Sequence, residues 1–195
     1  MRTAEIDRRT AETDICVRLN LDGTGKNQID TGIGFLDHML CLFSHHGGFD
    51  LDVACKGDTW VDGHHTTEDI GIALGEAFKA ALGAKEGIKR YGSMLLPMDE
   101  ALVLCAVDLS GRCMVRWNME LPCEKVGTFD TELGEEFFWG FARACAATVH
   151  MRQLDGENTH HILEAAFKAF GHAMKEAVAL DAALEGRLLS TKGVL

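Results

Sequence analysis

The chain contains the stretch Gly63-His64-His65-Thr66-Thr67-Glu68-Asp69 and a second version of it, Asn158-Thr159-His160-His161-Ile162-Leu163-Glu164. Both have the pattern His-His-x-x-Glu, and both are followed by apolar residues at helical spacing. When His64 is aligned with His160, Gly75 coincides with Gly171. The chain is therefore predicted to be a tandem duplication in which each half ends in a helix that begins with a histidine pair.

The chemistry of the repeated motif indicates metal binding. On a helix, the glutamate lies three and four residues beyond the two histidines, so it shares a face with each of them. Imidazole and carboxylate together are the ligands of divalent ions such as Zn, Mn, Fe and Ni. One such motif is equally compatible with helix capping or a polar surface. Two motifs at matching places favour a metal site, because helix packing alone does not require two histidines and a glutamate to recur in both halves.

Apolar periodicity predicts the same order of elements in each half. The first half is expected to have strands at residues 12–21 and 49–55, a returning hairpin strand at 26–30, and helices at 35–46 and 64–82. The second half is expected to have strands at 94–97, 101–109, 113–121 and 149–154, and helices at 132–147 and 160–180. We therefore predict an α+β fold made by tandem duplication of a sheet-plus-two-helices unit. The two halves are residues 1–92 and 93–195, packed as one compact chain.

Composition and charge argue against several classes of protein, including nucleic-acid-binding, membrane-spanning and disulfide-stabilised proteins. The 195 residues are 47% hydrophobic and carry a formal charge of −11, which argues against binding nucleic acid or an anionic membrane. No apolar run is long enough for a membrane span, and the N-terminus has no signal-peptide core. The seven cysteines are odd in number and never spaced Cys-x-x-Cys. We expect reduced thiols in a cytoplasmic protein.

The chain resembles the imidazoleglycerol-phosphate dehydratases of histidine biosynthesis along essentially its whole length. The segments that carry the resemblance follow one another in the family's order, and they are Gly34-Phe35-Leu36-Asp37-His38-Met39-Leu40, His64-His65-Thr66-Thr67-Glu68-Asp69, Pro97-Met98-Asp99-Glu100-Ala101, Asp108-Leu109-Ser110-Gly111-Arg112, Glu157 to Ala165, and Ser190-Thr191-Lys192-Gly193. The resemblance implies a ribosomal protein S5 domain 2-like fold. It also implies two Mn²⁺ ions per active site and a homo-oligomer of 24 subunits built from trimers, with active sites at subunit interfaces.

The reaction implied by this family removes water from imidazoleglycerol phosphate to give imidazoleacetol phosphate. The hydrogen that leaves is not next to a carbonyl, so the imidazole ring must act as the electron sink. The resemblance implies an imidazolate bound to two metal ions, one at each ring nitrogen. A ring with two nitrogens suits two near-equivalent sets of ligands.

The family's pattern also assigns the metal ligands. One ion takes His38, His65, Glu68 and His161. The other ion takes His64, His160, Glu164 and the residue at position 136. This last position is often histidine in the family but is Glu136 here. A carboxylate is a competent Mn²⁺ ligand, and the alternative is that water takes its place.

The resemblance further indicates residues for proton transfer and phosphate binding. The proton-transfer candidates are Glu12, Asp99, Glu164 and Lys168, and Glu12 is also expected to contact substrate. For Glu12 an exposed strand carboxylate is an equally good interpretation, and for Lys168 a plain ion pair with Glu164 is an alternative. For Asp99 we expect burial at the start of an apolar strand, which would favour a role. The phosphate is expected to bind Arg90, Arg112, Ser190 and Lys192, although such residues are often merely solvated.

Two other functions are compatible with the residues alone. A binuclear metallohydrolase would use the same kind of ligands, and a requirement for an imidazole-bearing substrate would separate it from a dehydratase. A non-catalytic metal-binding cage protein would have the metal ligands but would not need the phosphate residues. The set of Arg90, Arg112 and Lys192 argues against such a cage.

Overall fold

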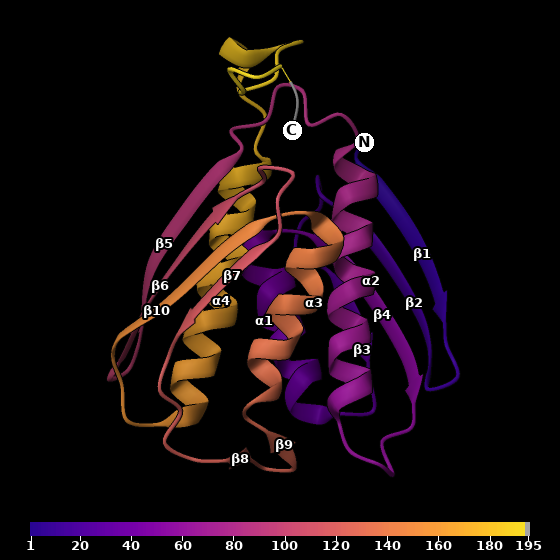
Figure 1. The fold of residues 1–195 in the computed structure, drawn as a ribbon, viewed down its shortest axis with the longest axis vertical. Coiled ribbons are helices and arrows are strands. Elements are labelled where there is room, and N and C mark those ends of the chain that lie inside the picture. The colour runs from indigo at the N-terminus through magenta and orange to yellow at the C-terminus, as the bar shows by residue number, and fades with distance from the viewer. Residues whose placement is uncertain (194–195) are drawn as a thin grey trace.

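Two four-stranded sheets enclose a layer of four helices in the computed structural model, which describes residues 1–193 (Figure 1). The first sheet has the strand order β1-β2-β4-β3, and the second has the order β5-β6-β10-β7. In each sheet the first three strands in this order are antiparallel neighbours, and the fourth is parallel to the third. The same topology therefore occurs twice, and the predicted α+β duplication is confirmed.

The predicted helices are confirmed to within two residues at each end. The helices are α1 (Gly34–Gly47), α2 (His64–Leu82), α3 (Leu133–Cys145) and α4 (Thr159–Val178), and a 3-10 turn, η1, follows at Ala182–Leu184. The strands are β1 (Thr3–Arg9), β2 (Thr13–Asn20), β3 (Asn27–Asp30), β4 (Asp50–Gly57), β5 (Tyr91–Met98), β6 (Ala101–Asp108), β7 (Met114–Asn118), β8 (Lys125–Val126), β9 (Phe129–Asp130) and β10 (Thr148–Asp155). None of the helices within residues 1–193 is both long and apolar enough to cross a membrane.

The predicted boundary between the halves, after residue 92, lies inside β5, which begins at Tyr91. The division into halves stays a prediction. The last two residues of the predicted second half, Val194 and Leu195, lie outside the described residues.

One prediction about the first sheet was wrong, and one of its strands was not predicted. Residues 26–30 do not return along β2 as a hairpin, because β3 pairs in parallel with β4, with Ile29 opposite Val53. The chain is directed there by Asp50, whose Oδ1 accepts hydrogen bonds from the backbone N–H of Thr24 (2.8 Å) and of Lys26 (3.1 Å). In addition β1 was not predicted, because this edge strand is half-exposed and its apolar signal is weak.

The helices pack in two equivalent parallel pairs, α1 with α4 and α2 with α3. Glycine permits the close approach in both pairs. A Cβ at Gly171 of α4 would lie 2.7 Å from the carbonyl oxygen of Phe43 in α1, and a Cβ at Gly75 of α2 would lie 2.5 Å from that of Phe141 in α3. The glycines that coincide in the sequence repeat are therefore the crossing points of the two helix pairs.

A closed ring of four buried phenylalanines, one from each helix, joins the two pairs. The ring centroids are separated by 5.1 Å for Phe43–Phe170, 5.0 Å for Phe170–Phe141, 5.5 Å for Phe141–Phe78 and 5.9 Å for Phe78–Phe43. Aromatic contacts at these distances add to the stabilisation that comes from burial. The two halves consequently share one core, and the N-terminal ends of all four helices lie at the same end of the molecule (Figure 1).

Candidate active site

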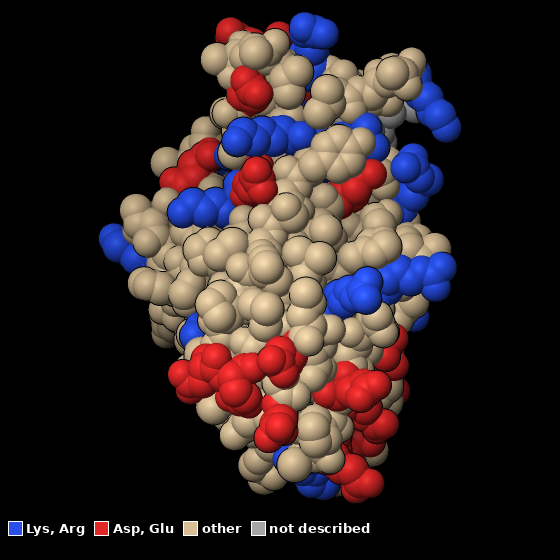
Figure 2. Space-filling view, turned by 90° about the vertical axis from the view of Figure 1, so that its left-hand side faces the viewer, with Lys and Arg blue, Asp and Glu red and all other residues tan. Residues whose placement is uncertain are grey.

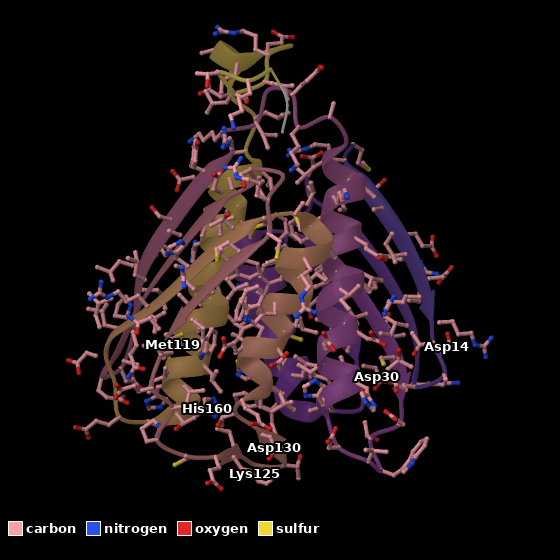
Figure 3. The ribbon with its side chains drawn as sticks, viewed as in Figure 1. Asp14, Asp30, Met119, Lys125, Asp130 and His160 are labelled. Carbon is pink, nitrogen blue, oxygen red and sulfur yellow. The ribbon has the colours of Figure 1, made fainter. Side chains whose placement is uncertain are left out.

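The histidine motifs begin α2 and α4, so both lie at the lower end of the molecule in Figure 1. Figure 3 shows His160 at this end, near the short β8–β9 hairpin that carries Lys125 and Asp130. On the face that carries β5, β6 and β10, Asp and Glu side chains gather in the lower part (Figure 2). Negative charge at this end favours the approach of a cation.

His38, His160 and Glu164 form a compact group of metal-ligand types between α1 and α4. One ligand atom from each residue lies within 4.8 Å of those of the other two. The Glu164 Oε2 atom lies 3.1 Å from His160 Nε2 and 3.5 Å from His38 Nε2. Two imidazoles that converge on one carboxylate oxygen are a donor set that suits a divalent ion.

Lys168 holds the other oxygen of the same carboxylate. Its Nζ lies 2.6 Å from Glu164 Oε1, one helical turn along α4. Burial raises the pKa of the Glu164 carboxyl, but the hydrogen bonds from Lys168 and His160 outweigh it and hold the pKa below its usual value. Glu164 is therefore ionised at neutral pH. The predicted alternative for Lys168, an ion pair with Glu164, is present, and it does not exclude a role in proton transfer.

The first-half motif shows a looser version of the same arrangement. His64 Nε2 lies 3.9 Å from Glu68 Oε2, and the other oxygen of Glu68 accepts a hydrogen bond of 3.1 Å from Arg143 of α3. His64 and Glu68 correspond to His160 and Glu164 in the repeat. Both motifs consequently place a histidine and a glutamate on one exposed helix end.

The helix packing identifies Glu136 as the counterpart of His38. Phe43 and Phe141 occupy the same place in the two helix pairs, and His38 and Glu136 each precede these residues by five positions. Glu136 is half-buried and has no hydrogen-bond or ion-pair partner among residues 1–193. Its carboxylate is therefore free for a ligand from outside the chain.

The second histidine of the first motif, His65, lies between two carboxylates. Its Nδ1 is 3.0 Å from Asp58 Oδ2, and its Nε2 is 3.7 Å from Glu12 Oε1. The hydrogen bond with Asp58 raises the pKa of His65 above its usual value. Glu12 is half-exposed, as the alternative interpretation of this residue expected.

His161 of the second motif has matching surroundings. Its Nδ1 lies 2.7 Å from Glu100 Oε2, and its Nε2 lies 3.6 Å from Asp99 Oδ2. The hydrogen bond from His161 lowers the pKa of Glu100 to about 2. Burial of Asp99 was predicted wrongly, because Asp99 lies in the turn between β5 and β6 and its side chain is 70% exposed.

The residues predicted to bind phosphate lie at the opposite end of the helices. The Arg90 backbone N–H donates to the carbonyl of Ala177 near the end of α4, and its guanidinium binds both oxygens of Asp108 (2.7 and 3.2 Å) and the carbonyl of Leu189 (2.6 Å). At the 1.5 Å rise of an α-helix, His161 and Ala177 are about 24 Å apart. The predicted metal ligands and Arg90 therefore do not meet within one chain.

The other three predicted phosphate residues belong to exposed turns. Arg112 follows β6, where its N–H donates to Ser110 Oγ (3.3 Å), and the N–H of Lys192 donates to Ser190 Oγ (3.2 Å) near the C-terminus. Neither of the two histidine motifs shares a hydrogen bond or an ion pair with the other among residues 1–193. One chain therefore presents three separate groups of predicted site residues.

Comparison with known proteins decides the family. The sequence profile described as imidazoleglycerol-phosphate dehydratase matches residues 31–174. The chain belongs to the imidazoleglycerol-phosphate dehydratase family. Relatives of that name from Lachnoclostridium phytofermentans and Desulforamulus reducens are each 57% identical over 194 residues, which cover 100% of this chain and 98% of each relative.

Solved structures of imidazoleglycerol-phosphate dehydratases have the same fold. The Staphylococcus aureus structure is 41% identical, covers 92% of this chain and 99% of its own, and has a TM-score of 0.84. The Pyrococcus furiosus structure, in complex with (S)-C348, is 42% identical, covers 97% of this chain and 100% of its own, and has a TM-score of 0.82. The chain is accordingly a hydro-lyase of histidine biosynthesis that acts on imidazoleglycerol phosphate. This finding favours the dehydratase over the metallohydrolase and the non-catalytic cage.

Sequence reasoning missed Asp58, Glu100 and Arg143. Glu100 lies inside a segment that resembles the family, but only its neighbour Asp99 was considered for a role. Asp58 lies in a loop whose path the apolar pattern does not define. No spacing rule connects Arg143 to Glu68, because the contact depends on how α3 packs on α2.

Proposed function

We propose that the chain converts imidazoleglycerol phosphate to imidazoleacetol phosphate with two Mn²⁺ ions per active site. The observation that carries the proposal is the convergence of His38, a predicted ligand of one ion, with His160 and Glu164, predicted ligands of the other. One ion would be held by His38, His65, Glu68 and His161, and the other by His64, Glu136, His160 and Glu164. His38 lies beside members of the second set, which supports two ions held close together.

Glu136 supports rather than opposes this assignment. It occupies the place in the α2–α3 pair that His38 occupies in the α1–α4 pair, and the other helix of its pair carries His64 and Glu68. A half-buried carboxylate that has no hydrogen-bond or ion-pair partner among residues 1–193 is available to bind a cation. We therefore assign Glu136 as a ligand and not as a defect in the site.

When bound, the two ions would supply Lewis acidity to the imidazole ring of the substrate, so that the ring could act as an electron sink. The chain supplies the groups that move protons. Glu12 and Asp99 each stand within 4 Å of the Nε2 atom of a predicted ligand, and their exposure lets them reach a substrate bound there. Either carboxylate can take the proton that leaves the carbon chain of the substrate.

Lys168 is placed to donate a proton rather than to accept one. Its ammonium group lies 2.6 Å from Glu164 Oε1, next to the proposed metal site, where it can deliver a proton to the leaving hydroxyl. The same contact keeps Glu164 ionised, as a ligand requires. The pair thereby provides an acid next to the proposed metal site.

The active site of this proposal contains residues from several copies of the chain. Imidazoleglycerol phosphate is a small molecule, and about 24 Å of α4 separates His161 from the end of the helix where Arg90 lies. A complete site therefore needs histidine motifs from one or more copies and a phosphate-binding end from another. We propose an assembly of 24 copies built from trimers, in which Arg90, Arg112, Ser190 and Lys192 of one copy meet the histidine motifs of others. The seven free cysteines favour a reducing compartment such as the cytoplasm.

A mixing experiment tests this proposal. The His160→Ala variant lacks a metal ligand and the Arg112→Ala variant lacks a phosphate contact, so each is expected to be inactive alone. In assemblies formed by co-expression of both variants, about a quarter of the sites should combine an intact metal end with an intact phosphate end. Recovery of activity supports the shared site. Mixed assemblies, verified by native mass spectrometry, that stay inactive would contradict it.

A further inference from the structure

The second histidine of each motif is held through Nδ1 by a carboxylate that no sequence pattern singled out. Asp58 Oδ2 lies 3.0 Å from His65 Nδ1, and Glu100 Oε2 lies 2.7 Å from His161 Nδ1. The first histidines differ, because His64 and His160 face the glutamates of their own helices through Nε2. The Nδ1 contact is therefore specific to one position of the motif.

The two halves make this contact with different parts of the repeated unit. Asp58 lies in the loop between β4 and α2, whereas Glu100 lies in the turn between β5 and β6. In the duplicated topology, the β5–β6 turn corresponds to the β1–β2 turn and not to the β4–α2 loop. Duplication of one unit therefore does not explain why both histidines have a carboxylate at Nδ1. A functional requirement that the two histidines share does explain it.

The Asp58 carboxylate has little besides His65 to explain its burial. Asp58 is 8% exposed, its Oδ1 has no hydrogen bond, and among residues 1–193 only the His65 side chain forms a hydrogen bond or ion pair with its carboxylate. A buried carboxylate with an unsatisfied oxygen destabilises the fold. The contact with His65 is thus the evident benefit that offsets this cost.

Glu100 anchors both the ring and the helix that carries it. Its Oε1 accepts hydrogen bonds from the backbone N–H groups of Glu157 (3.3 Å) and Asn158 (2.8 Å). The side chain of Asn158 then accepts from the N–H groups of His160 (2.9 Å) and His161 (3.3 Å) and caps α4. One carboxylate therefore fixes the loop, the helix start and the His161 ring.

We propose that Asp58 and Glu100 are positioning residues that keep His65 and His161 in the tautomer with the proton on Nδ1. A neutral imidazole that donates from Nδ1 to a carboxylate presents the Nε2 lone pair, and it is held in one orientation. The inference deepens the proposed function, because it rests on His65 and His161 as metal ligands. It adds that each of these two rings is oriented, with Nε2 unprotonated, before the ion binds.

The test compares near-isosteric variants with neighbours of equal charge. Asp58→Asn and Glu100→Gln remove the carboxylate from Nδ1. Asp62→Asn and Glu157→Gln are the matched controls, because each removes the same charge close by without a hydrogen bond or ion pair to either ring. Asp62 lies in the same loop as Asp58, and Glu157 lies in the β10–α4 loop, where its N–H donates to Glu100. Asp62 accepts a hydrogen bond from the N–H of His64 (2.8 Å), and asparagine preserves this acceptor. An Asp58→Glu variant tests rescue.

The first measurement is the tautomer in the full-length, metal-free protein. Solid-state NMR of ¹⁵N-histidine-labelled protein, prepared at alkaline pH so that both rings are neutral and with His65→Ala and His161→Ala spectra for assignment, should show a protonated Nδ1 and a free Nε2 for both rings. Asp58→Asn should convert His65 to a mixture of tautomers and leave His161 unchanged, and Glu100→Gln should do the reverse. Unchanged tautomers in both variants would overturn the inference.

The second measurement is the affinity for Mn²⁺ by competition with a chromophoric chelator. Each positioning variant should bind Mn²⁺ about 10- to 100-fold more weakly, the controls should match the wild type, and Asp58→Glu should recover part of the loss. If the control variants lost as much affinity for Mn²⁺, the change in net charge alone would explain the loss, and the positioning role of Asp58 and Glu100 would be refuted. If the wild type binds no Mn²⁺, the proposed function fails, while the tautomer spectra still decide the inference. Should Asp58→Asn not fold, Glu100→Gln provides the same test in the other half.

Discussion

Replacing Gly75 with alanine should destabilise the protein, although alanine is the better helix former. The added Cβ would lie 2.5 Å from the Phe141 carbonyl oxygen, 2.9 Å from Ala144 Cβ and 3.0 Å from the Cys145 nitrogen. An ordinary carbon–oxygen contact is about 3.3 Å, so α2 and α3 must separate by about 0.8 Å. Two of the three atoms belong to the backbone, and no rotamer change moves them away.

The magnitude follows from two opposing effects. Overpacking of this kind costs about 1–3 kcal/mol, and the gain in helix propensity from glycine to alanine is about 1 kcal/mol. Because backbone atoms block the added Cβ, the overpacking cost lies near its upper limit. We therefore expect a net loss approaching about 2 kcal/mol in the free energy of unfolding, with a fall in Tm of roughly 4–8 °C for a chain of this length. Gly171→Ala should behave in the same way, because its Cβ would lie 2.7 Å from the Phe43 carbonyl oxygen.

Gly34→Ala is the control, because it adds a Cβ to a helix residue with nothing within 4 Å. It should be neutral or stabilising by up to about 1 kcal/mol. The assay is thermal and urea unfolding of the metal-free proteins, followed by circular dichroism. If Gly75→Ala is as stable as the wild type, or if Gly34→Ala loses as much stability, the account of the helix crossings is refuted.

Three further predictions concern the site and the core. The His64→Ala and His160→Ala variants should each lose metal-dependent activity, and full turnover by either would contradict the paired-metal assignment. Glu136→Ala should weaken the binding of one of the two ions in a chelator titration, whereas substitution of Glu135, which accepts from Trp139 Nε1, should not. Burial lowers the pKa of His46 and of His172, which share a hydrogen bond of 3.2 Å. Because the unfolded chain then binds more protons, the free energy of unfolding should fall as the pH drops below about 6.5, and a His172→Asn variant should show a smaller fall.

The sequence predicted the helices better than the sheets. The four helices have strong periodicity, and the repeat aligns them through residues such as Gly75 and Gly171, which proved to be their contact points. The partner of β3 was not predictable, because the side chain of Asp50 and the crossover through α1 select β4 as its neighbour. The edge strand β1 has too few apolar residues to be recognised.

In the candidate site, the residues on helices were predictable from the sequence and those in loops were not. The two motifs identified the histidines and glutamates, since their spacing on a helix fixes which side chains share a face. The resemblance identified His38, which reaches Glu164 only because α1 packs against α4. Asp58 and Glu100 were missed because their roles depend on loop conformation. The distance between the predicted metal ligands and the predicted phosphate residues could not be foreseen without the length and direction of α4.

The central claim is that this hydro-lyase requires divalent ions held by the two histidine motifs. The most direct test is to strip the protein with a chelator and to assay imidazoleglycerol-phosphate dehydration with and without added Mn²⁺, while light scattering follows the assembled mass. We predict that activity disappears on stripping and returns as Mn²⁺ approaches about two ions per chain. Undiminished turnover by protein that elemental analysis shows to be free of metal would contradict the claim.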